Sequence, residues 1–180
     1  PTADTHPDVV RRGRDFAEDV LGKTIVTCKD TPNFIANRIG TFVGQYRMLA
    51  AIENGYTVEE VDTLTGPFIG NPKTGTFRLS DVVGLDIWAH VTRNLHELAP
   101  ADESRDLFKL PEVATAMLER RWLGAKTNQG FYKTVIGEGG AKEFWVLNLK
   151  TLDYEPPTKV RFAVIGELRD LELPERLRQL

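Results

Sequence analysis

The chain has 180 residues, of which 41% are hydrophobic and 27% are charged, and its formal net charge at pH 7 is -3. This length and composition are sufficient for one well-buried core of a globular protein. The charges are spread along the sequence, so nothing favours binding to nucleic acid or to an acidic membrane surface, and no apolar run approaches the roughly 20 residues that cross a bilayer.

Cysteine and histidine usage argues against disulfides and metal centres. The single cysteine, Cys28, cannot form an internal disulfide, and no signal-peptide pattern opens the chain, so we expect a cytoplasmic protein. His90 and His96 are six residues apart, a poor match to the spacing that places two metal ligands on one helix face, and we predict no metal site. The sequence begins with Pro1 rather than Met, which we interpret as the mark of a fragment.

The first 30 residues predict one helix and one strand. Thr5 suits a helix N-cap and Gly22 suits a helix end, so we expect a helix over residues 5–21. The β-branched run at Lys23–Cys28 predicts a strand directly after it. Because a single strand needs neighbours for its backbone hydrogen bonds, we interpret residues 1–30 as the last helix and strand of a sheet-containing domain whose remainder lies upstream.

The central part of the chain, residues 31–133, carries helical patterns. Apolar residues at helical spacing predict a long helix that begins at Asn33 or Phe34 and ends at Gly55. Later patterns predict a helix over 57–66 that opens with a capping box, a helix pair within 77–95 hinged at Gly84, and a helix over 111–123. We therefore expect a helical domain.

From residue 134 onward the helical periodicity is lost. Glu143–Asn148 and Leu152–Glu155 have the pattern of two short strands and predict a small hairpin. Residues 162–180 predict a marginal, charged helix that Pro174 interrupts. We interpret residues 134–180 as a hairpin and an interdomain linker.

Three motifs resemble those of one enzyme family. Residues 29–38 read K-D-T-P-N-F-I-A-N-R, residues 70–86 contain F-R-L-S-D-V-V-G-L-D, and residues 124–132 read G-A-K-T-N-Q-G-F-Y. With the first helix and Leu21-Gly22-Lys23, these blocks stand in the order found in L-3-hydroxyacyl-CoA dehydrogenases. The resemblance covers residues 5–133 and is to the C-terminal domain of that family.

The resemblance implies a mainly α fold. Residues 31–133 would form a multihelical dehydrogenase C-terminal domain of the 6-phosphogluconate dehydrogenase C-terminal-like type, after the last helix and strand of a Rossmann-like domain. In the family, the NAD-binding turn, the catalytic His and the Glu that orients it belong to the N-terminal domain, so NAD would be bound by a domain absent from this chain. Gly137–Gly140 does not match a dinucleotide-binding turn, because it follows no apolar strand and opens no helix. The tail resembles the connection in long bacterial β-oxidation fusion enzymes.

The resemblance also indicates site residues. In the family, the Asn at the position of Asn37 reaches into the active site, so we expect Asn37 to be catalytic and to bind substrate. The loop that carries Pro72 lies near the acyl group in the family, which makes Pro72 and Phe77 candidate substrate contacts and Lys73 a candidate contact for a CoA phosphate. This loop has one extra residue, and Thr76 stands where the family has Pro, so the preferred acyl chain length could differ.

Other polar residues are expected to be structural. Asp81 and Asp86 would cap the helices around Gly84, and Arg38 would form a salt bridge. Lys126-Thr127 would form a turn that docks the aromatic pair after it, because the strand and the Gly-rich run of a phosphate loop are missing before it.

The implied function is that of the substrate-binding and oligomerisation domain of an NAD-dependent L-3-hydroxyacyl-CoA dehydrogenase of fatty-acid β-oxidation. The whole enzyme would act on an acyl-CoA substrate, and the domain alone would be inactive and would form a homodimer. One alternative is a non-catalytic helical dimerisation module. A second alternative is the matching domain of another NAD-dependent hydroxyacid dehydrogenase.

Overall fold

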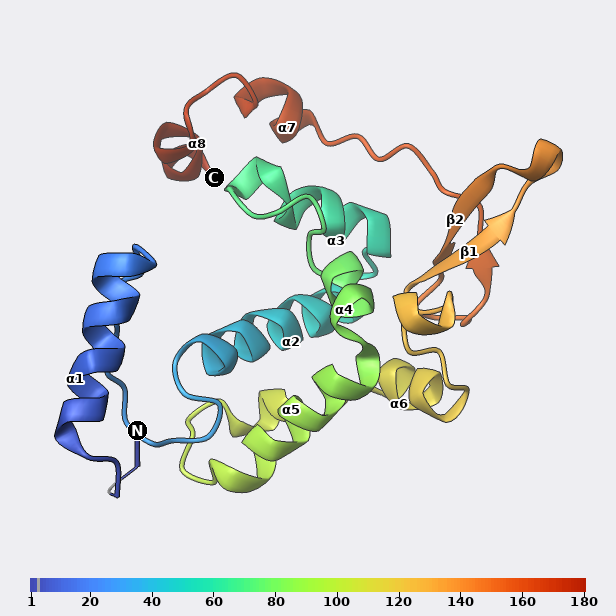
Figure 1. The fold of residues 1–180 in the computed structure, drawn as a ribbon. Helices are drawn as coiled ribbons and strands as arrows, with labels where there is room; N and C mark the ends of the chain where they lie inside the picture. The colour runs from blue at the N-terminus through green and yellow to red at the C-terminus, as the bar shows by residue number, and fades with distance from the viewer. Residues whose placement is uncertain (3) are drawn as a thin grey trace.

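A computed structural model describes residues 1–2 and 4–180, and the fold is mainly helical with one small sheet (Figure 1). The α-helices are α1 (Pro7–Asp15), α2 (Ala36–Asn54), α3 (Val58–Thr65), α4 (Phe77–Val83), α5 (Leu85–Leu98), α6 (Glu112–Glu119), α7 (Ala163–Leu168) and α8 (Leu173–Gln179). The π-helix η1 (Phe16–Val20) and the 3-10 helices η2 (Pro67–Ile69), η3 (Arg105–Phe108), η4 (Ala125–Thr127) and η5 (Glu138–Gly140) are single turns. The strands are β1 (Tyr132–Ile136), β2 (Lys142–Leu147) and β3 (Tyr154–Glu155). The predicted fold class, mainly α with a small sheet, is confirmed.

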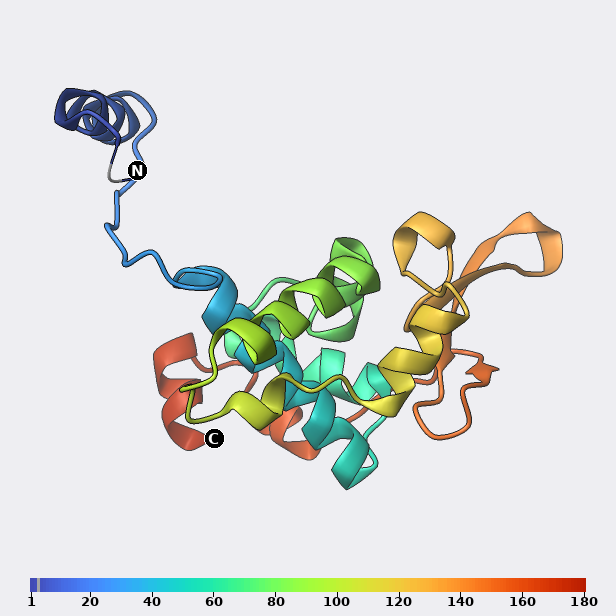
Figure 2. The same cartoon turned by 90° about the horizontal axis from the view of Figure 1, so that it is seen from below.

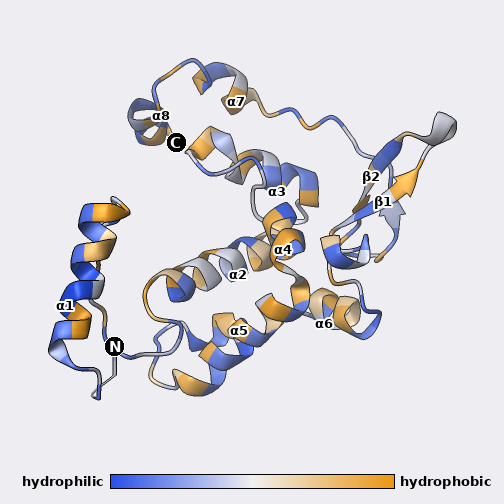
Figure 3. Ribbon diagram, in the orientation of Figure 1, coloured by the Kyte–Doolittle hydropathy of each residue, from blue (hydrophilic) through white to orange (hydrophobic). Residues whose placement is uncertain are grey.

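The N-terminal helix stands apart from the rest of the molecule. Figure 2 shows α1 joined to α2 only by an extended segment. The helix carries both hydrophilic and hydrophobic residues (Figure 3), and the side chains of Val9 and Phe16 are 61% and 54% exposed. An exposed apolar face of this kind is suited to packing against another structural element.

The strand predicted at Lys23–Cys28 is wrong. Within the described part of the chain, residues 22–29 pair with no other strand, and they are exposed. Strand propensity alone does not form a ladder, and the only sheet among the described residues lies at the opposite end of the molecule (Figure 1). The segment instead receives a hydrogen bond at the Thr27 hydroxyl from Arg14 Nη2 at 2.9 Å.

The long helix begins at Ala36, two or three residues later than the predicted start at Asn33 or Phe34. Asn33 and Phe34 have φ angles of 62° and 51°, in the left-handed region, so the chain makes a tight turn before α2 starts at Ala36. Gly55 ends α2 with a φ of 73°, as predicted. The predicted capping box at the start of α3 is also confirmed, because Thr57 and Glu60 each accept a hydrogen bond from the other's backbone N–H.

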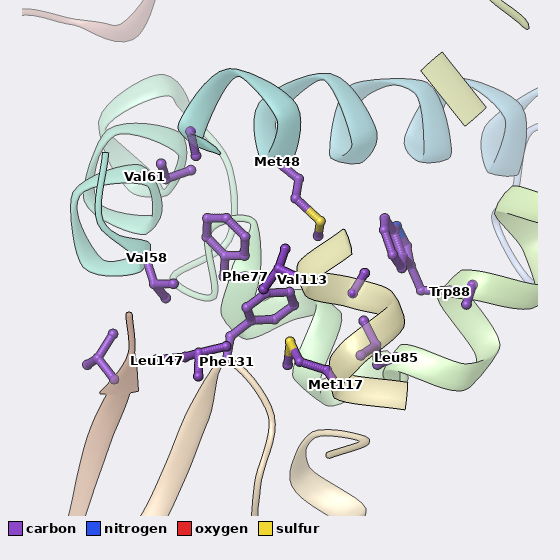
Figure 4. Close-up of a cluster of buried hydrophobic side chains, with 14 residues drawn as sticks. Met48, Val58, Val61, Phe77, Leu85, Trp88, Val113, Met117, Phe131 and Leu147 are labelled. Atoms are coloured by element: carbon purple, nitrogen blue, oxygen red, sulfur yellow. The ribbon is translucent and has the colours of Figure 1, made fainter. Parts of the chain in front are cut away.

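The hydrophobic core lies where α2 to α6 meet the sheet (Figure 4). At its centre the rings of Phe77 and Phe131 pack with their centroids 4.6 Å apart. The buried hydrophobic residues around them are Met48, Ala51, Val58, Val61, Leu85, Trp88, Ala89, Val113, Ala114, Met117, Val146 and Leu147. This core holds α2, α4 and α5 in fixed relative positions.

The sheet has three antiparallel strands in the order β1-β2-β3. The predicted hairpin is present, with Val146 opposite Glu155 and Leu147 opposite Tyr154. Strand β1 was not predicted; it pairs with β2 over five residues, with Lys133 opposite Trp145. Its sequence has no strong alternation, so its partner rather than its own pattern makes it a strand.

The C-terminal segment contains two short helices rather than one interrupted helix. Pro174 lies in the first turn of α8, where a missing N–H costs nothing. The segment packs on η2 and α3 (Figure 1), so part of the predicted linker is docked on the helical domain. No helix of the described residues has the length and apolar character needed to cross a membrane.

Candidate functional site

An apolar groove runs between α2, α4, α5 and the loop before α4. Its volume is about 680 Å³. It is lined by Ala36, Asn37, Gly40, Thr41, Val43, Gly44, Arg47, Asn71, Pro72, Gly75, Thr76, Leu79, Ser80, Val83, Ile87, Trp88 and Val91. A groove of this size, with apolar walls and a few polar groups, has the general character of a small-molecule site.

Asn37 and Pro72 lie on this groove. Asn37 is in the first turn of α2, its side chain is exposed, and its backbone carbonyl accepts a hydrogen bond from Thr41 Oγ1 at 2.7 Å. Pro72 lies on the loop wall, 35 residues later in the sequence. The fold therefore brings together two of the four site residues predicted from the sequence.

Lys73 and Phe77 lie elsewhere. Lys73 is exposed and lines a second hollow, together with Asp62 and Arg78, on the side of the loop that faces the sheet. Phe77 is 0% exposed and packs against Phe131. Its aromatic ring holds α4 on the core and cannot reach a ligand in the groove, so the motif that carries Phe77 is a folding signal at this position.

Arg47 is a groove residue that sequence reasoning missed. It is half-buried, and burial lowers the pKa of its guanidinium. Its Nη1 donates to Thr76 Oγ1 at 3.4 Å, and the Thr76 hydroxyl lies 2.8 Å from that of Thr65. Arg47 follows Asn37 by ten residues, which is about 15 Å along an α-helix. Helical spacing from Asn37 could have identified it, since steps of three, four and three reach residues 40, 44 and 47 on one face.

Asp62 holds the loop wall against α4. Its carboxylate accepts hydrogen bonds from the backbone N–H groups of Thr76, Phe77 and Arg78 at 2.7, 2.6 and 2.9 Å. It also accepts the hydroxyl hydrogen bond of Tyr132 at 2.8 Å. Burial raises the pKa of Asp62, and these hydrogen bonds oppose that shift. The carboxylate thus satisfies the free N–H groups at the start of α4.

Asp81 does not cap a helix, contrary to the sequence prediction. Its carboxylate is buried and accepts the backbone N–H groups of Phe131 and Tyr132 at 2.9 and 2.8 Å. Burial raises its pKa to about 6, against the effect of these hydrogen bonds and of the nearby Arg78. A Cβ on Gly130 would lie 2.0 Å from Asp81 Oδ1, so the G-F-Y motif needs this glycine for the approach.

Two ion pairs join the helices around the groove. Arg38 pairs with Asp102 on the loop after α5, which is the structural role predicted for Arg38. Asp86, in the first turn of α5, pairs with Lys126 of η4. The Lys126-Thr127 segment is a turn, as predicted: Thr127 Oγ1 accepts the backbone N–H of Leu123 at 3.0 Å.

The glycine-rich segment before β2 does not fit a dinucleotide. The glycine-rich Gly137–Gly140 segment is the turn between antiparallel strands β1 and β2, closed by a hydrogen bond from Gly137 N to Ala141 O at 2.8 Å. A pyrophosphate cradle needs such a turn to open a helix after a parallel strand. Among the described residues, no cluster of three His, Cys, Asp or Glu side chains is placed to hold a metal ion.

Comparisons with known proteins identify the family to which this chain belongs. Residues 34–134 match the model of the 3-hydroxyacyl-CoA dehydrogenase C-terminal domain family. The chain is 48% identical over 161 residues to a Bacillus subtilis protein named "Probable 3-hydroxyacyl-CoA dehydrogenase", covering 89% of this chain and 20% of that protein. It is 37% identical over 122 residues to the mitochondrial hydroxyacyl-coenzyme A dehydrogenase of Mus musculus, covering 66% of this chain and 36% of that protein.

Solved structures agree as well. FadB2 of M. tuberculosis has a TM-score of 0.65 and 29% identity, over 75% of this chain and 46% of that one. PaaH1 of Ralstonia eutropha, an (S)-3-hydroxybutyryl-CoA dehydrogenase, has a TM-score of 0.58 and 26% identity, over 68% of this chain and 42% of that one. The chain thus spans less than half the length of these relatives. It belongs to the 3-hydroxyacyl-CoA dehydrogenase family and carries that family's C-terminal domain.

Proposed function

We propose that this chain supplies the acyl-CoA-binding groove of an NAD-dependent L-3-hydroxyacyl-CoA dehydrogenase of fatty-acid β-oxidation. The observation that supports it most is that Asn37 and Pro72, far apart in sequence, line one apolar groove. The whole enzyme would oxidise an L-3-hydroxyacyl-CoA to the 3-oxo product. NAD and the catalytic His would come from a domain upstream of this chain, which alone would be inactive.

Asn37 would position the reacting part of the substrate. Its amide offers both N–H donors and a carbonyl acceptor, so it can bind a hydroxyl group and a thioester carbonyl oxygen. Within residues 1–2 and 4–180, no hydrogen bond engages this amide, so both functions remain available to a ligand. A donor aimed at an oxygen on which charge develops during the reaction stabilises the transition state.

The walls of the groove would hold the acyl chain. Val43 on α2, Leu79 and Val83 on α4 and Ile87 on α5 present apolar side chains to it. Burial of hydrocarbon contributes about 0.8 kcal/mol for each methylene group removed from water. Lys73, exposed beside Pro72, is our candidate contact for a CoA phosphate.

The same domain would form a homodimer in the cytoplasm. Ile35, the N-cap residue of α2, and Ile39, Phe42 and Tyr46 on α2 are between 38% and 59% exposed, and an exposed apolar row of this kind favours association. A purely non-catalytic dimerisation module would use this row but would have no need of Asn37 in a groove. A dehydrogenase that acts on another hydroxyacid would need a substrate groove, but it would not need the apolar residues that hold an acyl chain.

Photoaffinity labelling tests the proposal. The probe is a 3-hydroxyacyl-CoA with a diazirine at the end of its acyl chain, applied to the full-length protein that contains this chain. We expect labelled peptides from α2, α4 or α5, and competition by unmodified substrate. Gly40→Leu should reduce the labelling, because a Cβ at Gly40 meets nothing within 4 Å and the new side chain can extend into the groove.

The matched control is Gly13→Leu in α1. Gly13 is also a helical glycine with nothing within 4 Å of a Cβ, but it lies outside the groove. Its variant should label like the wild type. Labelling confined to peptides outside the groove would contradict the proposal.

A further inference from the structure

The C-terminal segment, residues 158–180, forms a strap across the face of the molecule opposite α5. It leaves the sheet, passes along α3 and ends beside η2 (Figure 1). At its start, the backbone N–H and hydroxyl of Thr158 donate to the Glu59 carboxylate at 2.7 and 3.1 Å. The strap lies beyond the residues 34–134 that match the family, so the family's role for its C-terminal domain does not account for it.

Arg176 joins the strap to η2. Its guanidinium donates to the carbonyl of Phe68 at 2.9 Å and lies 5.4 Å from the centre of the Phe68 ring. The same group donates to the carbonyls of Leu168, Arg169 and Leu171 at 3.2, 2.8 and 2.7 Å, which closes the turn between α7 and α8. One planar guanidinium group thus donates hydrogen bonds to four carbonyl oxygens, which its five N–H donors make possible.

A second contact lies one turn earlier on α8. Leu173 sits so close to Gly70 that a Cβ on Gly70 would lie 2.6 Å from Leu173 Cδ2. Gly70 also has a φ of 81°, which favours glycine at this position. Leu173 and Arg176 therefore hold the two ends of one short turn, from Phe68 to Gly70.

That turn leads directly into the groove wall. The N–H groups of Ile69 and Asn71 both donate hydrogen bonds to the carbonyl oxygen of Gly66, at 3.2 and 3.1 Å. These bonds make residues 66–71 one compact turn. Asn71 and Pro72 then line the groove. The far end of the same loop is fixed separately, by the hydrogen bonds of Asp62.

We propose that Arg176 is a positioning residue for the substrate groove: through the carbonyl of Phe68 it fixes the loop wall that carries Asn71 and Pro72. The substrate part of this inference rests on the proposed function. The loop wall lines the groove together with Val43 and Ile87, so its position sets how much room an acyl chain has. Arg176 touches no substrate and acts only through the loop.

Amide hydrogen exchange on the chain tests the structural part without any substrate. In Arg176→Ala, exchange at Ile69, Gly70 and Asn71 should rise by about tenfold or more, because their hydrogen bonds open more often. The amides of Phe77 and Arg78, held by Asp62, should be unchanged and serve as the internal control. The inference would be overturned if exchange rose equally at both sets of amides, or if it did not rise at Ile69, Gly70 and Asn71.

Two further variants sharpen this result. Arg178 lies two residues after Arg176, and Arg178→Ala removes only an exposed ion pair with Glu175, so it should change none of these amides. Arg176→Lys keeps the charge, but its compact ammonium cannot reach carbonyls on both sides of the turn, so exchange should be intermediate. A Lys variant that behaved like the wild type would show that charge alone is responsible and would contradict the positioning geometry.

Kinetics of the full-length protein test the link to substrate. Arg176→Ala should raise KM for a long-chain 3-hydroxyacyl-CoA by about three- to tenfold with kcat within twofold, since the wall affects binding rather than the reacting atoms. Faster exchange with unchanged KM would overturn the link between strap and groove. Failure of the proposed function would appear differently, as wild-type protein whose groove is not photolabelled, and would leave the exchange result intact.

Discussion

Asp62 offers the sharpest test of how the groove wall is built. Its carboxylate accepts three backbone N–H groups and the Tyr132 hydroxyl, at 2.6 to 2.9 Å. Asp62→Ala would remove every acceptor at once and leave the first turn of α4 without partners. Four hydrogen bonds at about 1 kcal/mol each give roughly 4 kcal/mol. The buried carboxylate also has a desolvation cost, which raises the Asp62 pKa and which the alanine variant no longer has. This offsets part of the lost hydrogen bonding, so we expect the free energy of unfolding to fall by about 3 kcal/mol.

Graded variants separate the components. Asp62→Asn keeps the oxygen that binds Thr76 and Phe77 but places an NH₂ group against the N–H of Arg78, so the loss should be about half as large. Tyr132→Phe removes a single bond and should cost about 1 kcal/mol. Combining the Asn and Phe variants should cost less than the sum of the two, because both remove the same contact.

Urea unfolding followed by tryptophan fluorescence measures these differences. If the free energy of unfolding falls by about 2 kcal/mol for each molar increase in urea, Asp62→Ala should lower the urea concentration at the unfolding midpoint by about 1.5 M. Asp106→Ala is the control, since that carboxylate is exposed and pairs with the exposed Lys109, and its midpoint should not move. Equal midpoints for the two alanine variants would refute the reasoning about Asp62.

Three other predictions follow from the site. The pKa of Asp81 is about 6 in the folded protein and roughly 4 in the unfolded chain, so between these pH values the folded state binds a proton that the unfolded state has lost. The free energy of unfolding of the wild type should therefore fall relative to that of Asp81→Asn as pH rises from about 4 to about 6. Parallel pH profiles for the two proteins would contradict this. Gly130→Ala should lower the melting temperature strongly, because its Cβ would meet Asp81 Oδ1, whereas Gly13→Ala should not; a similar melting temperature for both would count against this packing. Light scattering should return twice the chain mass at high micromolar concentration, since the exposed apolar row on α2 favours pairing; the monomer mass alone would argue against the dimer.

Sequence signals that act over a few neighbouring residues predict this structure most dependably. The capping box at Thr57 and the stop at Gly55 each depend on a few neighbouring residues, and both are in the structure as predicted. The hinge at Gly84 is also present, with a φ of 99° that suits glycine. Caps and turns of this kind are predicted correctly because they form through contacts between neighbouring residues and need no distant partner.

Features that depend on distant partners were predicted less well. Lys23–Cys28 has the composition of a strand but has no neighbour to pair with, whereas β1 has a weak pattern and forms because β2 lies beside it. The carboxylate of Asp81 binds backbone 50 residues away, which no local rule for helix caps could indicate.

The site shows the same division. The family motif pointed to Asn37 and to the loop at Pro72, which line one groove, but it did not tell which other motif residues face that groove. Phe77 faces the core instead, and its burial follows from the packing of α4 against Phe131. Arg47 lies outside every motif and enters the site only because it shares a helix face with Asn37.

The most direct test of the central claim is the turnover of Asn37→Ala in the full-length protein that contains this chain. With a 3-hydroxyacyl-CoA and NAD, kcat should fall by about ten- to a thousandfold, the range for a lost hydrogen bond to developing charge. The melting temperature should be unchanged, because the side chain is exposed at the start of α2. Asn54→Ala, at the other end of the same helix and outside the groove, should keep wild-type kinetics. Wild-type turnover in Asn37→Ala would contradict the proposal that this groove carries the chemistry.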